Sequence, residues 1–333
     1  MNTRTVQKVI HAIKKPEGVG AVVRRSIGVP GMYKFSPFLM LDHFYVPEGG
    51  FEAHPHSSIN TVTLVKKGAI MHEDFNNKGV LFEGDMQIMS SRSGIVHAEM
   101  PVALKSGQIP EGMQLWVDQP IELRKGEPSY TDVRGYEIEE AEEQDGKLKV
   151  SVLSGEAYGI KADRSLLDVP FHYYTYNLKP GAIFEQKFPE DFNVFLYVMK
   201  GDGLKISDGT EINEFHTGFF KTDGSSVKGA NPISNDDEIE FLLVGGKILD
   251  QPTVHYGPFV ADSQAQLREI IEDYSYQRNA FAPMRHWQSL ISSGVTQDMV
   301  DKYGGSESER DKKRDEYLAK KRELVTDEFK DEL

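Results

Sequence analysis

The sequence predicts an all-β fold made of two tandem β-barrels, followed by a short helix and a charged tail. Short apolar or alternating segments recur along residues 5–244, and glycine, asparagine and proline separate them. Such spacing, without long helical periodicity, is typical of antiparallel barrels or sandwiches. The length of 333 residues exceeds the size at which a single core stops growing, which favours two domains.

The first barrel is expected within residues 1–135. Its strands are predicted from alternation and from β-branched content, most clearly in residues 59–66. Gly68, Gly79 and the pair Gly84-Asp85 mark turns between further short strands. The segments expected to form strands and their turns are residues 5–13, 18–28, 38–41, 59–66 and 113–117.

A second β-rich block is expected within residues 136–292, after an acidic and weakly apolar segment at 128–147 that we interpret as inter-domain. The predicted strands are residues 150–153, 171–178, 194–199, 204–206 and 239–244. Residues 64–68, followed by Gly84-Asp85, parallel residues 197–201, followed by His216-Thr217-Gly218. This internal similarity favours a tandem of two related barrels.

The periodicity becomes helical at residues 264–276. Apolar residues there are spaced as on one helical face, and Ser263 is placed to cap the first turn. We expect this helix to pack within the second domain. Residues 293–333 form the charged tail. For its most charged part, residues 306–333, a marginal surface helix and a solvated, disordered tail are the two alternatives; we expect the solvated tail. Its thin apolar stripe consists of Tyr317, Leu318, Leu324 and Val325.

The composition excludes several classes of protein. The chain has no cysteine, which removes disulfides, thiolate nucleophiles and cysteine-bound zinc or iron–sulfur clusters. The formal net charge of −14 disfavours direct binding to the phosphate backbone of nucleic acids. We therefore expect no nucleic-acid ligand, and we expect the chain to act as a monomer.

Targeting signals are weak. The first 30 residues lack the apolar core of a signal peptide, and no apolar run approaches the roughly 18 residues that span a bilayer. We expect a protein of the cytoplasm or nucleus without membrane attachment. The ending Lys330-Asp331-Glu332-Leu333 matches an ER-retention signal, which acts only on a protein already in the lumen. We interpret it as the chance ending of an acidic tail.

Two pairs of potential ligands, His54-Pro55-His56 and His97-Ala98-Glu99, mark a candidate metal site. Residues i and i+2 of a strand share a face, so each pair points one way. If both segments are strands of one curved sheet, three imidazoles and one carboxylate converge. Such ligands suit Fe, Cu, Ni, Zn or Mn. Octahedral coordination leaves two positions open for water, dioxygen or substrate, whereas four-coordinate zinc would close the site and indicate a structural role.

The other histidines carry weaker signals. His72, with Glu73, is placed either to orient a ligand imidazole or to cap a turn. His43 and Asp42 follow an apolar run and are expected at the rim of the site. His172 and His216 are isolated on apolar strands, as core histidines are, so we expect no metal in the second barrel. No role is assigned to His11, His255 and His286.

The chain resembles the pirins, a bicupin group of the cupin superfamily, from about residue 17 to residue 291. The motifs that carry the resemblance include Glu17-Gly18-Val19-Gly20, His54-Pro55-His56, His72-Glu73-Asp74-Phe75, Gly84-Asp85-Met86-Gln87, Gly94-Ile95-Val96-His97-Ala98-Glu99-Met100-Pro101, Gln114-Leu115-Trp116-Val117 and Gly257-Pro258-Phe259-Val260. Two segments depart from the usual pattern. Residues 57–60 are Ser-Ser-Ile-Asn where pirins typically have Arg-Gly-Phe-Glu, and Ile88 stands where many have Trp. We expect these changes to alter the charge and shape near the metal.

The resemblance implies two cupin barrels of the jelly-roll type, with one Fe(II) per chain in the first. Its ligands would be His54, His56, His97 and Glu99. Pirins are associated with dioxygen-dependent cleavage of flavonols such as quercetin, which makes a quercetin 2,3-dioxygenase the first hypothesis. Glu99 would then act as the base that deprotonates the metal-bound substrate. The alternative is a non-catalytic protein whose iron oxidation state changes the surface around Arg24 and Arg25 and thereby its affinity for a transcription-factor partner. A third possibility is a zinc- or nickel-loaded protein with neither role.

Overall fold

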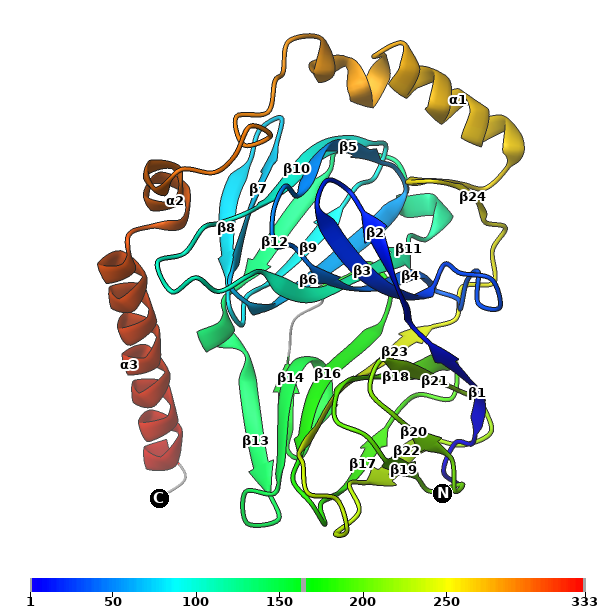
Figure 1. Ribbon diagram of the computed structural model, residues 1–333, viewed down its shortest axis with the longest axis vertical. Coiled ribbons are helices and arrows are strands. Elements are labelled where there is room, and N and C mark those ends of the chain that lie inside the picture. Colours follow the sequence, from blue (N-terminus) through cyan, green and yellow to red (C-terminus); the bar gives the residue numbers. More distant parts are fainter. Residues whose placement is uncertain (1, 163–165, 332–333) are drawn as a thin grey trace.

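The computed structural model describes residues 2–162 and 166–331, and its main feature is a pair of β-barrels stacked one above the other (Figure 1). Each barrel is formed by a large sheet and a four-stranded sheet, and all of the strand pairs in these sheets are antiparallel. The all-β, two-barrel prediction is therefore confirmed. Within the described residues, no helix is both long enough and apolar enough to cross a membrane.

The first barrel joins a seven-stranded sheet, in the order β12-β9-β6-β11-β4-β3-β2, to a four-stranded sheet, in the order β5-β10-β7-β8. Successive side chains of a strand point to opposite faces, and in the central strands β4 and β6 both faces are buried. The strands are β2 (Ile13–Glu17), β3 (Ala21–Ile27), β4 (Phe38–Tyr45), β5 (Phe51–His56), β6 (Ile59–Lys67), β7 (Ala69–Asp74), β8 (Lys78–Phe82), β9 (Met86–Ser90), β10 (Ile95–Pro101), β11 (Glu111–Asp118) and β12 (Ser129–Val133).

The second barrel joins an eight-stranded sheet to a four-stranded one. Its interior is filled by aromatic and branched side chains such as Tyr176, Phe184 and Phe241, all at most 1% exposed. The strands are β13 (Glu139–Glu143), β14 (Leu148–Ala157), β15 (Ile160–Ala162), β16 (Phe171–Leu178), β17 (Ile183–Lys187), β18 (Phe192–Lys200), β19 (Leu204–Ile206), β20 (Glu211–Ile212), β21 (His216–Phe220), β22 (Ser226–Ala230) and β23 (Ile239–Lys247).

The first strand of the chain, β1 (Val6–His11), belongs to the second barrel, because it pairs with β21. Arg4, just before it, is fully buried and donates hydrogen bonds to the carbonyl oxygens of Phe192, Pro189 and Gly224. β1 was expected in the first domain, residues 1–135, and the structure places it in the second barrel instead. The division at residue 135 otherwise stays a prediction.

The segment at 128–147 is not a plain linker. Its start forms β12, which pairs with β9 in the first barrel, and its end forms β13, which pairs with β14 in the second. A short 3-10 helix, η2 (Gly135–Glu137), turns the chain between them; another, η1 (Ile121–Leu123), follows β11. Both strands lie at sheet edges, where few side chains are buried, so they contain few apolar residues. For this reason the sequence did not predict them.

One hydrophobic core is shared between the barrels. Residues of the large sheet of the first barrel, such as Phe38 and Leu115, pack against residues of the second, such as Phe195 and Leu242. The Phe38 and Phe195 rings meet edge to face with centroids 5.0 Å apart. The two barrels therefore bury their large sheets against each other rather than against solvent.

The predicted helix is confirmed as α1 (Gln264–Ser275), and the Ser263 side chain accepts a hydrogen bond from the Gln266 backbone N–H. It does not pack within the second domain as expected. Leu267 of α1 shares a hydrophobic cluster with Val96 of β10, so α1 covers the first barrel (Figure 1). The hairpin of β24 (Val254–Tyr256) and β25 (Phe259–Ala261) leads to α1, and the 3-10 helix η3 (Asn279–Arg285) follows it.

The tail folds into α2 (Gln297–Gly304) and α3 (Glu307–Asp331). For residues 306–333 the structure therefore shows the surface helix and not the solvated tail that we expected. Buried Val300 of α2 packs in one cluster with Met71, Ala98 and Met100, on the outer face of the sheet that carries β10. Along α3, Arg310 lies over the Phe82 ring at 3.9 Å, and Lys321 pairs with Glu139 of β13 at 3.1 Å. The side chains of Leu324 and Val325, and residues Glu332 and Leu333 of the retention-like ending, lie outside the described part.

Candidate metal centre

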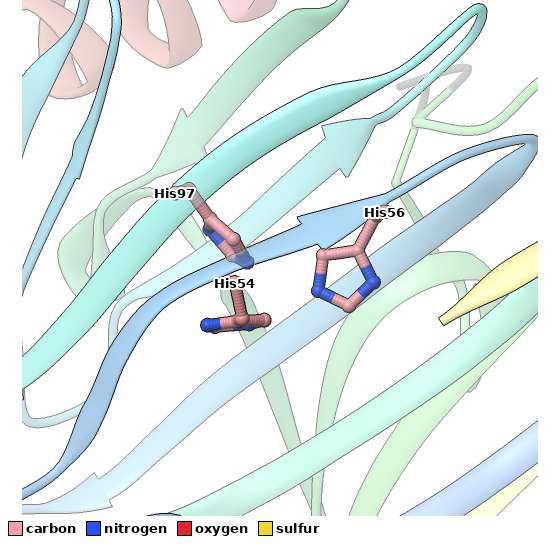
Figure 2. Close-up of side chains that lie close together, drawn as sticks. All are labelled: His54, His56 and His97. Carbon is pink, nitrogen blue, oxygen red and sulfur yellow. The ribbon is translucent and has the colours of Figure 1, made fainter. Parts of the chain in front are cut away.

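Strand register brings the predicted histidines together. β5 and β10 are antiparallel neighbours in which His97 faces His54 and Ile95 faces His56. Their imidazoles converge in Figure 2, with ring centroids 4.4 Å apart for His54 and His97 and 5.0 Å apart for His56 and His97. One nitrogen from each ring lies within 4.8 Å of the others. Among residues 2–162 and 166–331, these three residues form the one such group of potential metal ligands.

Glu99 lies beside this group rather than inside it. The pairing of β5 with β10 shifts register between His97 and Glu99, so that Glu99 faces Phe51. Its Oε2 is 4.0 Å from His97 Nε2, which is too long for a hydrogen bond. The carboxylate still lines the cavity that His54 and His56 line. That all four side chains bind one ion stays a prediction.

The state of the imidazole nitrogens fits a divalent metal ion. Both ring nitrogens of His56 and both of His97 are buried without a hydrogen-bond partner among the described residues. His54 Nδ1–H donates to the Glu52 carbonyl oxygen at 2.7 Å, which leaves the Nε2 lone pair free. Unpaired buried nitrogens cost free energy, and coordination to a metal would remove that cost.

Burial also sets the charge of the site. Desolvation lowers the pKa of His54, and it lowers the pKa of His56 and of His97 further, with the neighbouring imidazoles adding to the effect. These rings are therefore neutral near pH 7, the form that binds metal. Burial raises the pKa of Glu99 to about 7. A nearby cation would favour the carboxylate form of Glu99.

A cavity of about 500 Å³ opens beside the three histidines. Its walls are largely apolar, with Met40, Phe44, Ile70 and Trp116 among them, and Trp116 meets His56 edge to face at 5.1 Å. Sequence reasoning missed most of these residues because they lie on strands distant from the histidine motifs. The volume is that of a site for a drug-sized organic molecule.

One ion pair is built into the cavity wall. Arg25 donates two hydrogen bonds to the Asp42 carboxylate, at 2.7 and 2.6 Å, and lies 3.2 Å from Glu17. Asp42 is thus a buried wall residue rather than a rim residue. His43, on the other face of β4, points away from the cavity and lies 3.0 Å from both the Tyr197 hydroxyl and a Glu111 oxygen.

His72 and Glu73 were expected either to orient a ligand imidazole or to cap a turn, and the two side chains point to opposite faces of β7. His72 faces the barrel interior, directly opposite Glu99 in the strand register, and stacks on Tyr130 at 5.5 Å. Glu73 faces outward and accepts hydrogen bonds from Ser289 and from the backbone of Leu290 and Ile291. Neither residue caps the turn that follows β7. The Asp74 carboxylate does so, because it accepts hydrogen bonds from the backbone N–H groups of residues 76 and 77.

The remaining histidines lie apart, with one exception. His172 packs against Phe188 and Phe192, and His216 stacks on His11 with centroids 4.6 Å apart. The exception is His255, which lines the cavity although no role was assigned to it. The usable signal was the adjoining Gly257-Pro258 motif, whose residues also line the cavity.

The sequence departures lie outside the cavity. Ser57 is buried and donates to the Ser93 carbonyl oxygen, Asn60 accepts from Ser90 and Gln119, and Ile88 packs in the core between the barrels. None of the three is among the residues that line the cavity. Ser57 nevertheless follows His56 and its N–H donates to the carbonyl oxygen of Pro258, which lines the cavity. The expected effect of these changes on the surroundings of the metal stays a prediction.

Comparisons with known proteins find two family models that match this chain. The family model described as Pirin matches residues 20–117, and the one described as Pirin C-terminal cupin domain matches residues 173–280. A pirin-like protein from Solanum lycopersicum is 36% identical over 288 residues, covering 86% of this chain and 96% of its own length.

Two solved structures share the fold. A quercetin 2,3-dioxygenase from Acinetobacter baumannii aligns with a TM-score of 0.76 at 22% identity, over 83% of this chain and 98% of its own. A bacterial pirin from Escherichia coli in complex with nickel(II) aligns with a TM-score of 0.56 at 20% identity, over 73% of this chain and 99% of its own.

Proposed function

The chain belongs to the pirin family, and from that premise we propose that it is an iron-dependent dioxygenase that cleaves flavonols of the quercetin type. The observation that carries the proposal is that three neutral imidazoles, each with a nitrogen free to bind a metal ion, converge beside a largely apolar cavity that His54 and His56 line. A structural metal site would instead be closed by its ligands. The fold shared with a quercetin 2,3-dioxygenase supports the same choice.

Different side chains around the cavity would have different roles in such a reaction. His54, His56 and His97 would hold the iron, with Glu99 beside them. When bound, the iron supplies Lewis acidity toward a substrate hydroxyl and a one-electron couple for dioxygen chemistry. The apolar wall around Phe44, Ile70 and Trp116 excludes water from the flat rings of the substrate.

Glu99 is the residue placed to take the substrate proton. Its carboxyl group is buried at the cavity wall; burial raises its pKa to about 7, and a bound cation would favour the carboxylate form, which accepts a proton. The carboxylate oxygen would accept the hydrogen of the flavonol 3-hydroxyl. Ring cleavage by dioxygen then releases carbon monoxide, so that both oxygen atoms end in the opened product.

The test is turnover by metal-defined protein. Full-length protein is loaded with Fe(II) without oxygen and given quercetin and air-saturated buffer, and oxygen uptake and carbon monoxide release are recorded. We expect both in equal amounts, and their loss in His97→Ala, while a matched change at the isolated His172 (His172→Ala) retains them. Turnover no faster than that of free Fe(II) contradicts the proposal.

The identity of the metal is tested separately. Protein purified without added metal is analysed for iron, nickel, zinc and manganese. We expect about one iron per chain, because three imidazoles and a carboxylate suit Fe(II). Nickel in the site, as in the bacterial pirin, would leave the roles of the cavity residues unchanged. It would contradict iron as the metal.

The alternative role, an iron-dependent switch for a transcription-factor partner, is less favoured by the surface that it requires. Arg24 and Arg25 point to opposite faces of β3: Arg24 lies over Phe215 at 3.8 Å, and Arg25 is tied to Asp42 inside the cavity. They do not form one exposed patch. Equal recovery of a partner with the Fe(II) and Fe(III) forms would remove this role.

A further inference from the structure

The cavity next to the three histidines is completed by the other half of the chain. His255, Gly257 and Pro258 line it together with residues of the first barrel. They belong to the β24–β25 hairpin, about 200 residues away from His54 and His56 in the sequence. The hairpin therefore contributes to a site whose metal ligands it does not supply.

The hairpin is fixed directly to the strand that carries the ligands. The Ser57 N–H donates to the Pro258 carbonyl oxygen, and the Val260 N–H donates to the Ser57 carbonyl oxygen, both at 3.2 Å. Ser57 is the residue immediately after His56. The position of His255 relative to the metal ligands is thus set by backbone hydrogen bonds rather than by a free loop.

One tautomer of His255 is selected by the turn. Its Nε2–H donates to the Gly257 carbonyl oxygen at 2.6 Å, and Gly257 adopts a φ of +54° in this turn. Desolvation is the main cause that lowers the pKa of His255, so the ring is neutral near pH 7. Nδ1 then has a lone pair and accepts hydrogen bonds; no described residue donates to it.

One aromatic ring connects the candidate metal ligands to His255. The ring centroid of Trp116 lies 5.1 Å from that of His56 and 6.5 Å from that of His255. His255 is exposed, whereas His56 is buried. A planar molecule of three rings that bound at the metal ligands and extended along Trp116 would approach His255.

Two of the carboxylates that line the cavity are already engaged in ion pairs. Asp42 and Glu17 both face Arg25, which holds them in ion pairs. His255 Nδ1 remains available to a neutral donor such as a phenolic hydroxyl.

We propose that His255 determines substrate specificity, by accepting a hydrogen bond at Nδ1 from a phenolic hydroxyl on the end of the substrate remote from His54, His56 and His97. This inference rests on the proposed flavonol dioxygenase and adds the residue that would select, among flavonols, those with a hydroxyl on the pendant phenyl ring. His255 is a substrate-contacting residue and takes no part in the proton transfer assigned to Glu99.

The experiment compares two ligands and two variants by binding. Fe(II)-loaded full-length protein is titrated without oxygen with quercetin and with the flavonol that lacks both pendant-ring hydroxyls, and the quenching of tryptophan fluorescence gives each Kd. The test variant, His255→Phe, keeps a ring against Trp116 and loses the acceptor. The matched control, His286→Phe, changes an exposed histidine outside the cavity.

We expect His255→Phe to raise the Kd for quercetin by roughly 3- to 10-fold, the effect of one hydrogen bond, and to leave the Kd of the other flavonol unchanged. In turnover, KM for quercetin should rise while kcat stays the same. An equal change for both ligands, or none, overturns the role of His255 and leaves the dioxygenase standing. Failure of the unaltered protein to bind either flavonol overturns both.

Discussion

At the scale of single residues, burial of ionisable side chains determines what the site can bind. His56 and His97 keep all four ring nitrogens away from water and from other protein donors, and the loss of solvation holds the rings neutral. A neutral imidazole without a partner is a poor core residue but a good metal ligand. The same desolvation keeps Glu99 protonated to a higher pH than an exposed glutamate.

Metal binding should therefore stabilise the fold measurably. A ligand present at about 100 times its Kd stabilises the native state by about 2.7 kcal/mol. We expect a chelator to lower the melting temperature of the metal-loaded protein. His56→Ala should abolish this response, whereas His172→Ala in the second barrel should keep it. A chelator effect of equal size in all three proteins would contradict assignment of the metal to this site.

Acid stability should depend on Glu111. The hydrogen bond from His43, followed by that from Lys67, lowers its pKa from 4.5 to about 2. A carboxylate whose folded pKa is depressed adds stability above pH 4.5 and loses it as the pH falls toward 2. Because the group is partly exposed, we expect about 1 to 2 kcal/mol rather than the full shift.

Urea unfolding at several pH values checks the role of Glu111. Glu111→Gln should be less stable than the unaltered protein at pH 6, and the difference should shrink below pH 4.5. Glu122→Gln, at an exposed position, serves as the control. A difference that does not depend on pH would show that Glu111 acts by packing and not by its charge.

At the scale of elements, the C-terminal helices support the strands that carry the ligands. α2 covers Met71, Ala98 and Met100, which lie on the back of β7 and β10, while the metal site lies on the front. The buried Glu73 holds the chain in place just before α2, at residues 289–291. By contrast, α3 meets the barrels through side chains near the surface, such as Arg310 and Lys321.

Two truncations should separate the roles of these helices. Removal of residues 306–333 eliminates α3, and we expect a loss of only about 1 to 2 kcal/mol, because surface ion pairs and cation–π contacts contribute little. Removal of residues 293–333 also eliminates α2 and uncovers the apolar back of β7 and β10. We expect a much larger fall in melting temperature and weaker metal binding. Equal losses in the two truncations would contradict this division.

At the scale of the whole molecule, the two related barrels differ in what fills them. The first keeps histidines, carboxylates and a cavity inside, whereas the second is filled by rings such as Tyr176, Phe184 and Phe241. The second barrel acts as a support: its large sheet shares a core with the first. The segment after it supplies the hairpin that completes the cavity.

Because of this shared core, the barrels should unfold together. Phe195→Ala removes a fully buried ring from the second-barrel side and should cost about 3 to 5 kcal/mol. Trp116 and Trp287 both contact the first barrel, so tryptophan fluorescence reports that half, while circular dichroism reports both. We expect the two signals to shift together. Separate transitions would show that the barrels are independent.

The sequence by itself determined the features that depend on spacing along one strand or helix. Residues two apart share a face, so His54 with His56 and His97 with Glu99 were predicted as pairs, and the period of residues 264–276 gave α1. The motifs also indicated the family. These features are local, and local stereochemistry is the same in any fold.

Only the tertiary structure decided which segments meet. The register shift that sets Glu99 beside the histidines, the transfer of β1 to the second barrel and the contribution of His255 to the cavity depend on contacts between distant residues. The order of the tail depends on the apolar surface of β7 and β10 that α2 covers. Such contacts leave no local period, because the energy of each segment depends on a surface supplied by another part of the chain.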